Sequence, residues 1–303
     1  MKNTKRLYTE RINKVVEHVN THLHEPLSLQ MLADIACFSS FHFHKIFVAI
    51  TGETVNAFTN RLRLEKSARL LKYSSTSITG IALDCGFSSS STFSRSFKQH
   101  FGISASQYKR GEEFQNNKIC KELFPINEYL LPMSEKELQK AFPVTIKNLP
   151  KRRVAFIRVV DAYREDLVLK AFNHIVDWAK QMGIYETETI FGMSLDDPMV
   201  TPKEKYRYEV CLTIPDTFEV NNNSGISTMT MPACKYGVTI VSGNINMVAT
   251  ATGYLFNNWL INSKYEPEHQ HALEIFLDKE NVCNWNYFDL EICIPVKPLQ
   301  YIY

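Results

Sequence analysis

One ordered pattern of residues occurs twice in the first 110 positions, with the copies about fifty residues apart. Each copy contains an alanine, a Phe-Ser pair, two phenylalanines four positions apart and a closing glycine. The copies are Ala33, Cys37, Phe38, Ser39, Phe43, Lys45, Phe47 and Gly52, and then Ala82, Gly86, Phe87, Ser88, Phe93, Arg95, Phe97 and Gly102. Each copy predicts a short helix, a tight turn and a second helix, so the sequence predicts two helix-turn-helix units.

Capping and stop signals set the expected helix bounds in this half of the chain. Ser28 and Ser77 are suited to the N-cap position, and Gly52 and Gly102 to helix ends. We expect helices over 29–36, 40–50, 55–73, 78–85 and 89–100. The helix over 55–73 would be about 28 Å long at 1.5 Å per residue. A rigid spacer of that size suits two helices that enter successive major grooves of DNA, which lie about 34 Å apart.

The charge distribution supports a polyanionic partner for this half alone. Residues 1–111 carry 15 Lys and Arg against 7 Asp and Glu, a balance of +8. Residues 112–303 carry 19 and 25, a balance of −6. A basic half joined to an acidic half indicates that the first binds nucleic acid and the second does not.

The second helix of each unit is the expected recognition helix. The phenylalanines at 43, 47, 93 and 97 follow helical spacing and are expected in the core. The candidate base-reading residues are Phe41, His44, Lys45, Ser90, Ser91, Ser94 and Arg95. Arg95 and Lys45 can donate hydrogen bonds to guanine, and serine hydroxyls can contact bases or phosphates. For Phe41, core packing and contact with a thymine methyl group both remain open.

Residues 10–110 resemble the AraC-type DNA-binding domain. The matching positions include Leu29, Leu32, Ala33, Phe43, Phe47, Gly52, Arg61, Leu62, Ala68, Leu71, Ile81, Ala82, 86–88, 93–98, 102–104 and 108–110. Two positions depart from the family pattern, because Ala105 stands where proline is usual and Cys37 where a small flexible residue is common. The resemblance implies an all-α domain, with two helix-turn-helix units joined by a long helix, that binds double-stranded DNA sequence-specifically.

The acidic half contains a second internal repeat, with an offset near 82 residues. Each copy predicts strand, helix, strand and strand, over 153–160, 164–182, 190–195 and 206–215, and then 235–243, 245–262, 272–278 and 288–296. Two such copies predict an α+β fold with a mostly antiparallel sheet and a cleft at a pseudo-twofold axis. The expected domains are therefore 1–111 and 143–303, with a linker over 112–142.

Glu274 is the candidate binding residue of this half. Alternation along the strand puts Glu274 on one face with Ala272 and Phe276, and a carboxylate among apolar neighbours needs a partner. Such a carboxylate beside aromatic rings suits a hydrophobic cation. The candidate pocket walls are Tyr163, Phe191, Tyr208, Trp259, Tyr287 and Phe288. An exposed Glu274, or one paired with Lys or Arg, is the alternative. Glu209 and Glu291 are expected on the other, solvated face.

This half resembles the GyrI-like effector-binding domain, over roughly 143–303. The likeness rests on the duplicated topology, the run from Trp259 to Pro267, the strand around Glu274 and the closing stretch 290–296. It implies that Glu274 lies in the pocket of a small-molecule effector, often an amphipathic cation. The order of the two domains resembles AraC-family regulators of Rob-like architecture.

We therefore expect a cytoplasmic transcription regulator whose partners are double-stranded DNA, a small-molecule effector and RNA polymerase. No catalytic residues, metal site, cofactor or membrane segment are predicted, and the seven dispersed cysteines are expected as free thiols. Two alternatives for the acidic half stay open. It could be a hydrolase of small reactive molecules, with a buried glutamate as general base. It could instead recruit a partner without binding a ligand.

Overall fold

A computed structural model of the 303-residue chain describes residues 2–112, 126–164, 166–198, 200–220, 224–268 and 270–299. The chain forms two compact units, Met1–Lys121 and Glu122–Tyr303. Residues 113–125, which make up the first part of the expected linker, lie outside the described residues. Among the described helices, none combines the length and the apolar composition that a membrane crossing requires.

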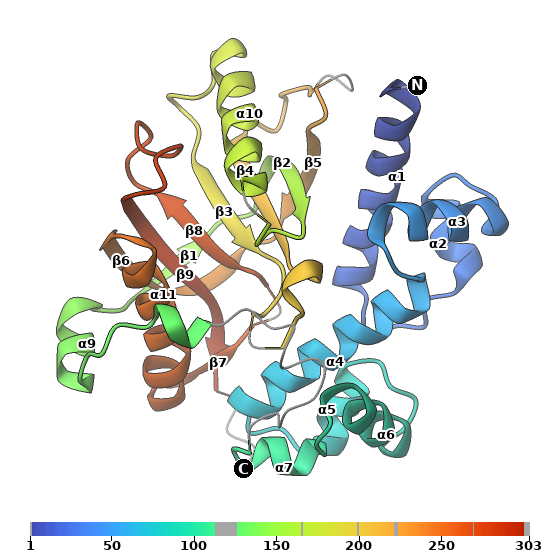
Figure 1. The fold of residues 1–303 in the computed structure, drawn as a ribbon, viewed down its shortest axis with the longest axis horizontal. Coiled ribbons are helices and arrows are strands. Elements are labelled where there is room, and N and C mark those ends of the chain that lie inside the picture. Colours follow the sequence, from blue (N-terminus) through green and yellow to red (C-terminus); the bar gives the residue numbers. More distant parts are fainter. Residues whose placement is uncertain are drawn as a thin grey trace. The chain divides into compact units, whose positions relative to one another are not determined.

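In the described residues of the first unit, all regular secondary structure is helical (Figure 1). Its helices are α1 (Lys2–Thr21), α2 (Leu29–Ile35), α3 (Ser40–Thr51), α4 (Val55–Tyr73), α5 (Ile78–Asp84), α6 (Ser90–Phe101) and α7 (Ala105–Lys109). The pairs α2–α3 and α5–α6 are the two helix-turn-helix units, and they lie at the two ends of α4 (Figure 1). The bounds predicted for these five helices are correct to within one residue.

Local hydrogen bonds explain why these helices start and stop where they do. Five side-chain hydroxyls each accept a backbone N–H at a helix start, namely those of Ser28, Ser39, Thr54, Ser77 and Ser89. Gly52 and Gly102 end the two recognition helices in the left-handed region, with φ of 78° and 81°. Glycine adopts this region at no steric cost, so both helices end sharply.

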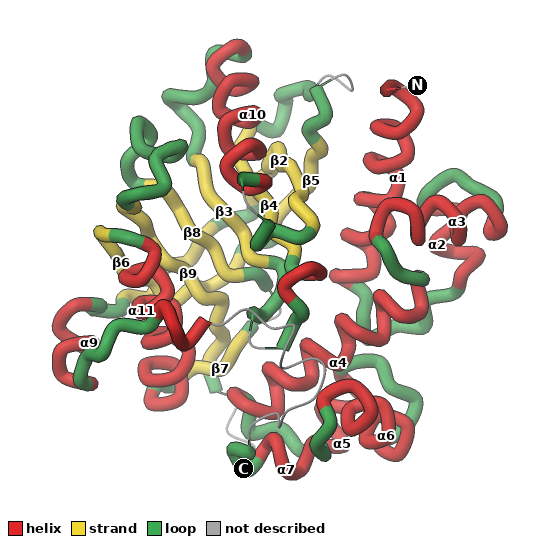
Figure 2. The backbone as a smooth tube through the Cα atoms, in the orientation of Figure 1, coloured by secondary structure: helices red, strands yellow, loops and turns green. Residues whose placement is uncertain are grey.

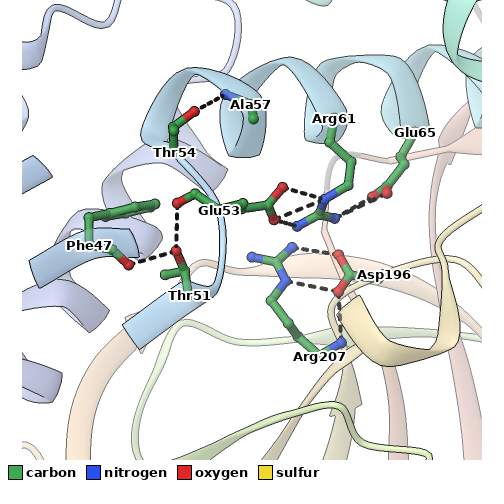
Figure 3. Close-up of polar contacts among 9 residues, drawn as sticks. All are labelled: Phe47, Thr51, Glu53, Thr54, Ala57, Arg61, Glu65, Asp196 and Arg207. Atoms are coloured by element: carbon green, nitrogen blue, oxygen red, sulfur yellow. Dashed lines mark hydrogen bonds and ion pairs between the residues drawn. The ribbon is translucent and has the colours of Figure 1, made fainter. Parts of the chain in front are cut away.

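Arginines on α4 connect it to the surrounding loops. Arg63 donates from Nε to the carbonyl oxygen of Leu23 and from Nη2 to that of Glu25, both at 2.8 Å. Arg61 donates to Glu53 at 2.6 Å and to Glu65 at 3.1 Å (Figure 3). These charge-assisted bonds fix the loop before α4 and the loop after α1 against the long helix.

The second unit is built on an antiparallel nine-stranded sheet (Figure 2). Its strands are β1 (Thr145–Leu149), β2 (Arg152–Val160), β3 (Ile190–Ser194), β4 (Arg207–Ile214), β5 (Ser227–Met231), β6 (Cys234–Gly243), β7 (Tyr265–Pro267), β8 (Ala272–Phe276) and β9 (Phe288–Pro298). The order is β1-β6-β9-β8-β3-β4-β2-β5, and β7 pairs with β9.

Two long helices pack on the sheet, and shorter helical segments complete the unit. They are a 3₁₀ turn (Ile126–Tyr129), α9 (Glu135–Ala141), α10 (Leu167–Gln181), a second 3₁₀ turn (Lys203–Lys205), and α11 (Ile245–Tyr254) with its π-helical (Leu255–Trp259) and 3₁₀ (Leu260–Asn262) extensions. α10 packs on β2 and β4, and α11 packs on β6 and β9. The backbone N–H of Leu131 donates to Thr250 on α11 at 2.9 Å, so the last part of the expected linker packs on this unit.

The predicted duplication is present in the sheet. One copy is β2-α10-β3-β4 and the other is β6-α11-β8-β9, and they meet where β3 pairs with β8. Gly192 pairs there with Glu274, which is its equivalent 82 positions later in the repeat. The edge strands are exchanged, because β1 precedes β2 but pairs with β6, while β5 precedes β6 but pairs with β2. β1, β5 and β7 were not predicted from the sequence.

Candidate DNA-binding and effector-binding sites

The first recognition helix, α3, has one buried and one exposed face. Phe43 and Phe47 are fully buried, as their spacing predicts. Phe41, His44 and Lys45 are exposed on the other side, and Phe41 is 66% exposed. The core-packing alternative for Phe41 is therefore excluded. The Lys45 ammonium lies 4.3 Å from the centroid of the Phe41 ring, so a cation and an aromatic surface stand together on the exposed face.

The second recognition helix, α6, repeats this arrangement with different chemistry. Phe93 and Phe97 are fully buried, whereas Ser91, Ser94 and Arg95 are exposed. Ser90, in the first turn, is half-buried. The exposed face of α6 therefore offers hydroxyl groups and one guanidinium.

A groove of about 700 Å³ separates the two helix-turn-helix units. Its walls are the connection from α1 to α2, a polar stretch of α4 that includes Asn56, Thr59 and Asn60, and the turn around Gly86. None of the residues that line it is acidic. The groove is lined by both apolar and polar side chains and by the cationic Arg63, so its charge does not repel phosphate.

In the second unit, the strand register collects several side chains around Glu274. Paired residues of neighbouring strands face the same side of a sheet. Glu274 pairs with Gly192, and Ser194, two residues along β3, pairs with Tyr208. Phe172 of α10 contacts the ring of Phe276 at 5.1 Å and that of Tyr208 at 6.4 Å. Glu274 therefore lies on the helix-covered face, at the pseudo-twofold axis.

Glu274 is half-buried, and the hydroxyl of Tyr208 donates a hydrogen bond to its carboxylate. Burial raises the pKa of Glu274, and the hydrogen bond from Tyr208 opposes part of that rise. Burial also raises the pKa of Tyr208 well above its ordinary value, and the charge of Glu274 adds to it. The phenol is therefore the proton donor, and the carboxylate is held in a poorly solvated place.

Aromatic rings surround this carboxylate. The rings of Tyr163 and Tyr206 lie 4.6 Å apart. Burial is the main cause of the raised pKa of both tyrosines, and Glu274 adds to each, which places them within its electrostatic range. Trp285 contacts Phe172 at 6.3 Å and Phe288 at 6.0 Å, and it is 41% exposed. The cluster thus continues from the half-buried carboxylate to the surface.

Comparison with known families agrees with this geometry. The GyrI-like small molecule binding domain matches residues 142–297, which is just over half of the chain. The chain belongs to the GyrI-like family. A helix-turn-helix domain of the AraC type also matches residues 32–111, so the GyrI-like domain follows a helix-turn-helix module in the same chain.

Relatives of this GyrI-like protein include regulators. An uncharacterized HTH-type transcriptional regulator of Staphylococcus aureus (strain COL) is 29% identical over 186 residues, 60% of this chain and 24% of that protein. The transcriptional regulator Rob of Salmonella typhimurium (strain LT2) is 38% identical over 93 residues, 31% of this chain and 32% of Rob. The chain thus matches only a quarter to a third of the length of these relatives.

The DNA-binding domain of AdpA, solved in complex with a target DNA, is a structural neighbour of this chain. It is 29% identical, covers 33% of this chain and 91% of its own, and has a TM-score of 0.33.

The structure brings together only part of the predicted pocket of the GyrI-like domain. Glu274, Tyr163, Tyr208 and Phe288 lie in the cluster. Phe191 does not, because it pairs with Ile275 and its side chain is buried in the core on the opposite face. Trp259 packs over Gly237 and stacks on Tyr265 at 6.1 Å. Tyr287 is 50% exposed, and no described contact joins it to the cluster.

Three members of the cluster were missed, namely Phe172, Tyr206 and Trp285. Phe276 had been placed beside Glu274 by strand alternation. Tyr206 lies two residues before Tyr208, so the same alternation could have found it. Phe172 and Trp285 come from a helix and a loop, and no pattern in the sequence marks them as neighbours of Glu274.

Proposed function

We propose that this chain is a transcription regulator that binds double-stranded DNA through α3 and α6 and a lipophilic cation at Glu274. The single observation that carries the effector assignment is the position of Glu274 inside the aromatic cluster, with a tyrosine hydroxyl as its hydrogen-bond donor. RNA polymerase stays a proposed partner, on the ground that regulators of this class act on transcription.

The exposed faces of α3 and α6 support the DNA-binding part. Each carries a cationic side chain beside groups that can contact base edges, Lys45 with Phe41 and Arg95 with Ser94. The +8 balance of residues 1–111 supplies attraction to phosphate. Two recognition helices in one chain allow a monomer to occupy two successive major grooves.

The cluster around Glu274 supports the cationic effector. An ionised carboxylate in a poorly solvated place is stabilised by a cation, and aromatic faces attract a cation while they bury its apolar groups. A neutral or anionic ligand would leave the charge of Glu274 uncompensated. The chemistry therefore favours a permanently charged organic cation with aromatic or aliphatic groups.

Selection of binding sites from random duplex DNA, followed by transcription from a template that carries the selected site, tests the proposal. With purified full-length protein and RNA polymerase, tetraphenylphosphonium is expected to change either the DNA affinity or the transcript yield. No selected sequence would contradict the DNA-binding part. If a site is selected but tetraphenylphosphonium changes neither the DNA affinity nor the transcript yield, the effector part is contradicted and partner recruitment is favoured. Turnover of a ligand would favour the hydrolase alternative.

A further inference from the structure

The face of the sheet opposite Glu274 has its own buried cluster. It joins Phe191 and Leu273 from the middle of the sheet to Met231 of β5 and Tyr236 of β6. β5 and β6 lie near opposite ends of the strand order, so their meeting in one cluster shows that the sheet curves around this face. We call this side the concave face. It does not include Glu274, which points to the helix-covered side.

Arg152, the first residue of β2, brings a positive charge to the concave face. Alternation along β2 puts it on the same side as Val154 and Phe156, which belong to the concave cluster. Its guanidinium carbon lies 5.0 Å from the centroid of the Phe191 ring. The side chain is half-buried, so solvent still reaches part of it.

Burial lowers the pKa of Arg152, and the groups that oppose this are Tyr236 and three cysteines, Cys211, Cys234 and Cys293. None of these is a carboxylate. Within the described residues, the guanidinium forms no hydrogen bond or ion pair, and its one cation–π contact is with the ring of Phe191. A guanidinium has five N–H donors, which makes this arrangement costly for a partly desolvated charge.

Several other cationic side chains of the sheet have acceptors. Arg158 donates to Glu209 at 2.6 Å, and Arg207 donates to Asp196 at 2.8 Å (Figure 3). Arg153 donates to the carbonyl oxygen of Asp216 at 3.0 Å. Lys147 pairs with Glu291. Arg152 therefore differs from its neighbours on the same strands, and its donors are available to a ligand.

We propose that Arg152 is the centre of a second ligand site, on the concave face, for an aromatic carboxylate. The guanidinium would bind the carboxylate through two parallel N–H donors. The aromatic body of the ligand would pack on Leu149, Met229 and Cys234, which are apolar side chains at the rim of the cluster that are only partly buried. The charge preference is opposite to that of Glu274, so the two sites select different molecules.

Binding of 2-naphthoate to the full-length chain tests this site, with the fluorescence of the ligand as the signal and calorimetry as confirmation. Arg152→Met keeps the apolar stem and removes the charge, and it is expected to weaken binding tenfold or more. Lys151→Met is the matched control, because it removes an exposed neighbouring charge. Binding to Lys151→Met and to Glu274→Gln is expected to equal that of the wild type. The neutral analogue 2-naphthamide is expected to bind more weakly than 2-naphthoate.

Several results would overturn the assignment. The first is the absence of naphthoate binding to the wild type at millimolar concentration. The second is an affinity of Arg152→Met for naphthoate equal to that of the wild type. The third is a loss of affinity in Lys151→Met as large as that in Arg152→Met. If Arg152→Met does not fold, Arg152→Lys decides. This variant keeps the positive charge but loses the two parallel N–H donors of the guanidinium. Its affinity for naphthoate is therefore expected to fall several-fold at an unchanged melting temperature, and wild-type affinity would contradict the site. Because Glu274→Gln leaves this binding intact, a failure here is distinguishable from a failure of the cation proposal.

Discussion

The hydroxyl of Tyr208 occupies the space that a side chain at position 192 would need, since a Cβ built on Gly192 would lie 1.5 Å from it. Gly192 and Glu274 are equivalent positions of the internal repeat and pair across the pseudo-twofold axis. The duplicated sheet is therefore asymmetric at its centre. One copy supplies the carboxylate, and the other supplies the glycine that gives Tyr208 room to reach it. Leu290 stands at the position equivalent to Tyr208.

Gly192→Ala is expected to expel Tyr208 from its place beside Glu274. The added methyl group would overlap the phenol, and overpacking of this kind costs about 1–3 kcal/mol. Urea unfolding should show the loss as a lower midpoint at an unchanged slope. Tyr208→Ala removes the clash, so the double variant should be more stable than the sum of the single effects implies. Additive effects of the two substitutions on the free energy of unfolding would mean that the side chains at positions 192 and 208 are not in contact.

Cation binding is expected to depend on the raised pKa of Glu274. The carboxylate must be ionised to attract a cation, so affinity should be full above this pKa and fall as the pH drops through it. Because burial raises the pKa, the fall should occur above the ordinary glutamate value of 4.5. Titrations of tetraphenylphosphonium at a series of pH values measure the midpoint. Tyr208→Phe removes the opposing hydrogen bond, and a midpoint that did not move upward would contradict its role.

The same ionisation affects stability without a ligand. The folded protein holds the proton of Glu274 more tightly than the unfolded chain does. The free energy of unfolding should therefore decrease as the pH rises from the unfolded pKa to the raised folded one. Glu274→Gln should lack this part of the pH dependence. Urea unfolding of both proteins across this pH range provides the comparison, and identical profiles would show that burial does not perturb Glu274.

On the DNA side, Arg95→Ala is expected to cost about 1–3 kcal/mol on a selected site and to relax the preference at one base pair. Lys98→Ala is the comparison, since Lys98 is also exposed on α6 but is expected to contact phosphate. It should weaken all sequences alike and reduce the salt dependence of binding. Fluorescence anisotropy of labelled DNA at several salt concentrations distinguishes the base contact expected for Arg95 from the phosphate contact expected for Lys98. An unchanged affinity of Arg95→Ala for the selected site would remove Arg95 from the interface.

Substitutions in the turns of the two helix-turn-helix units are expected to have opposite effects on stability. Cys37 adopts φ of 53°, a region that L-residues avoid at a cost of about 1–2 kcal/mol, so Cys37→Gly should stabilise the protein. Gly86 has φ of 81°, and a Cβ there would meet the carbonyl oxygen of Leu23 at 2.3 Å. Gly52→Ala, with similar φ and open space, is the control. Gly86→Ala should lower the melting temperature more than Gly52→Ala does, and the reverse order would be inconsistent with these contacts.

Much of the DNA-binding unit could be predicted because its signals are local. Ser28 and Ser77 cap helices, Gly52 and Gly102 end them, and helical spacing separates Phe43 from the exposed Lys45. These features act within one turn of the chain, so the sequence alone locates the helices and their faces.

The effector site was predicted only in part because it depends on long-range pairing. Alternation placed Glu274 with Phe276 correctly, but the face of Phe191 follows from the register of β3 against β8. Glu209 was wrongly expected in solvent. Its side chain is fully buried and pairs with Arg158, because the sheet curves around that face. Trp285 reaches the cluster from the loop between β8 and β9, where there is no periodicity to follow.

Titration of tetraphenylphosphonium into the wild type and Glu274→Gln tests the central claim most directly. Tryptophan fluorescence can follow it, since Trp285 lies in the cluster, and calorimetry gives the affinity. The uncharged triphenylphosphine oxide is the matched control ligand. We predict binding that the substitution weakens at least tenfold, about 1.4 kcal/mol, with no such effect on the neutral ligand. Equal affinity of both proteins for the cation, or no binding to either, would contradict a cation site at Glu274.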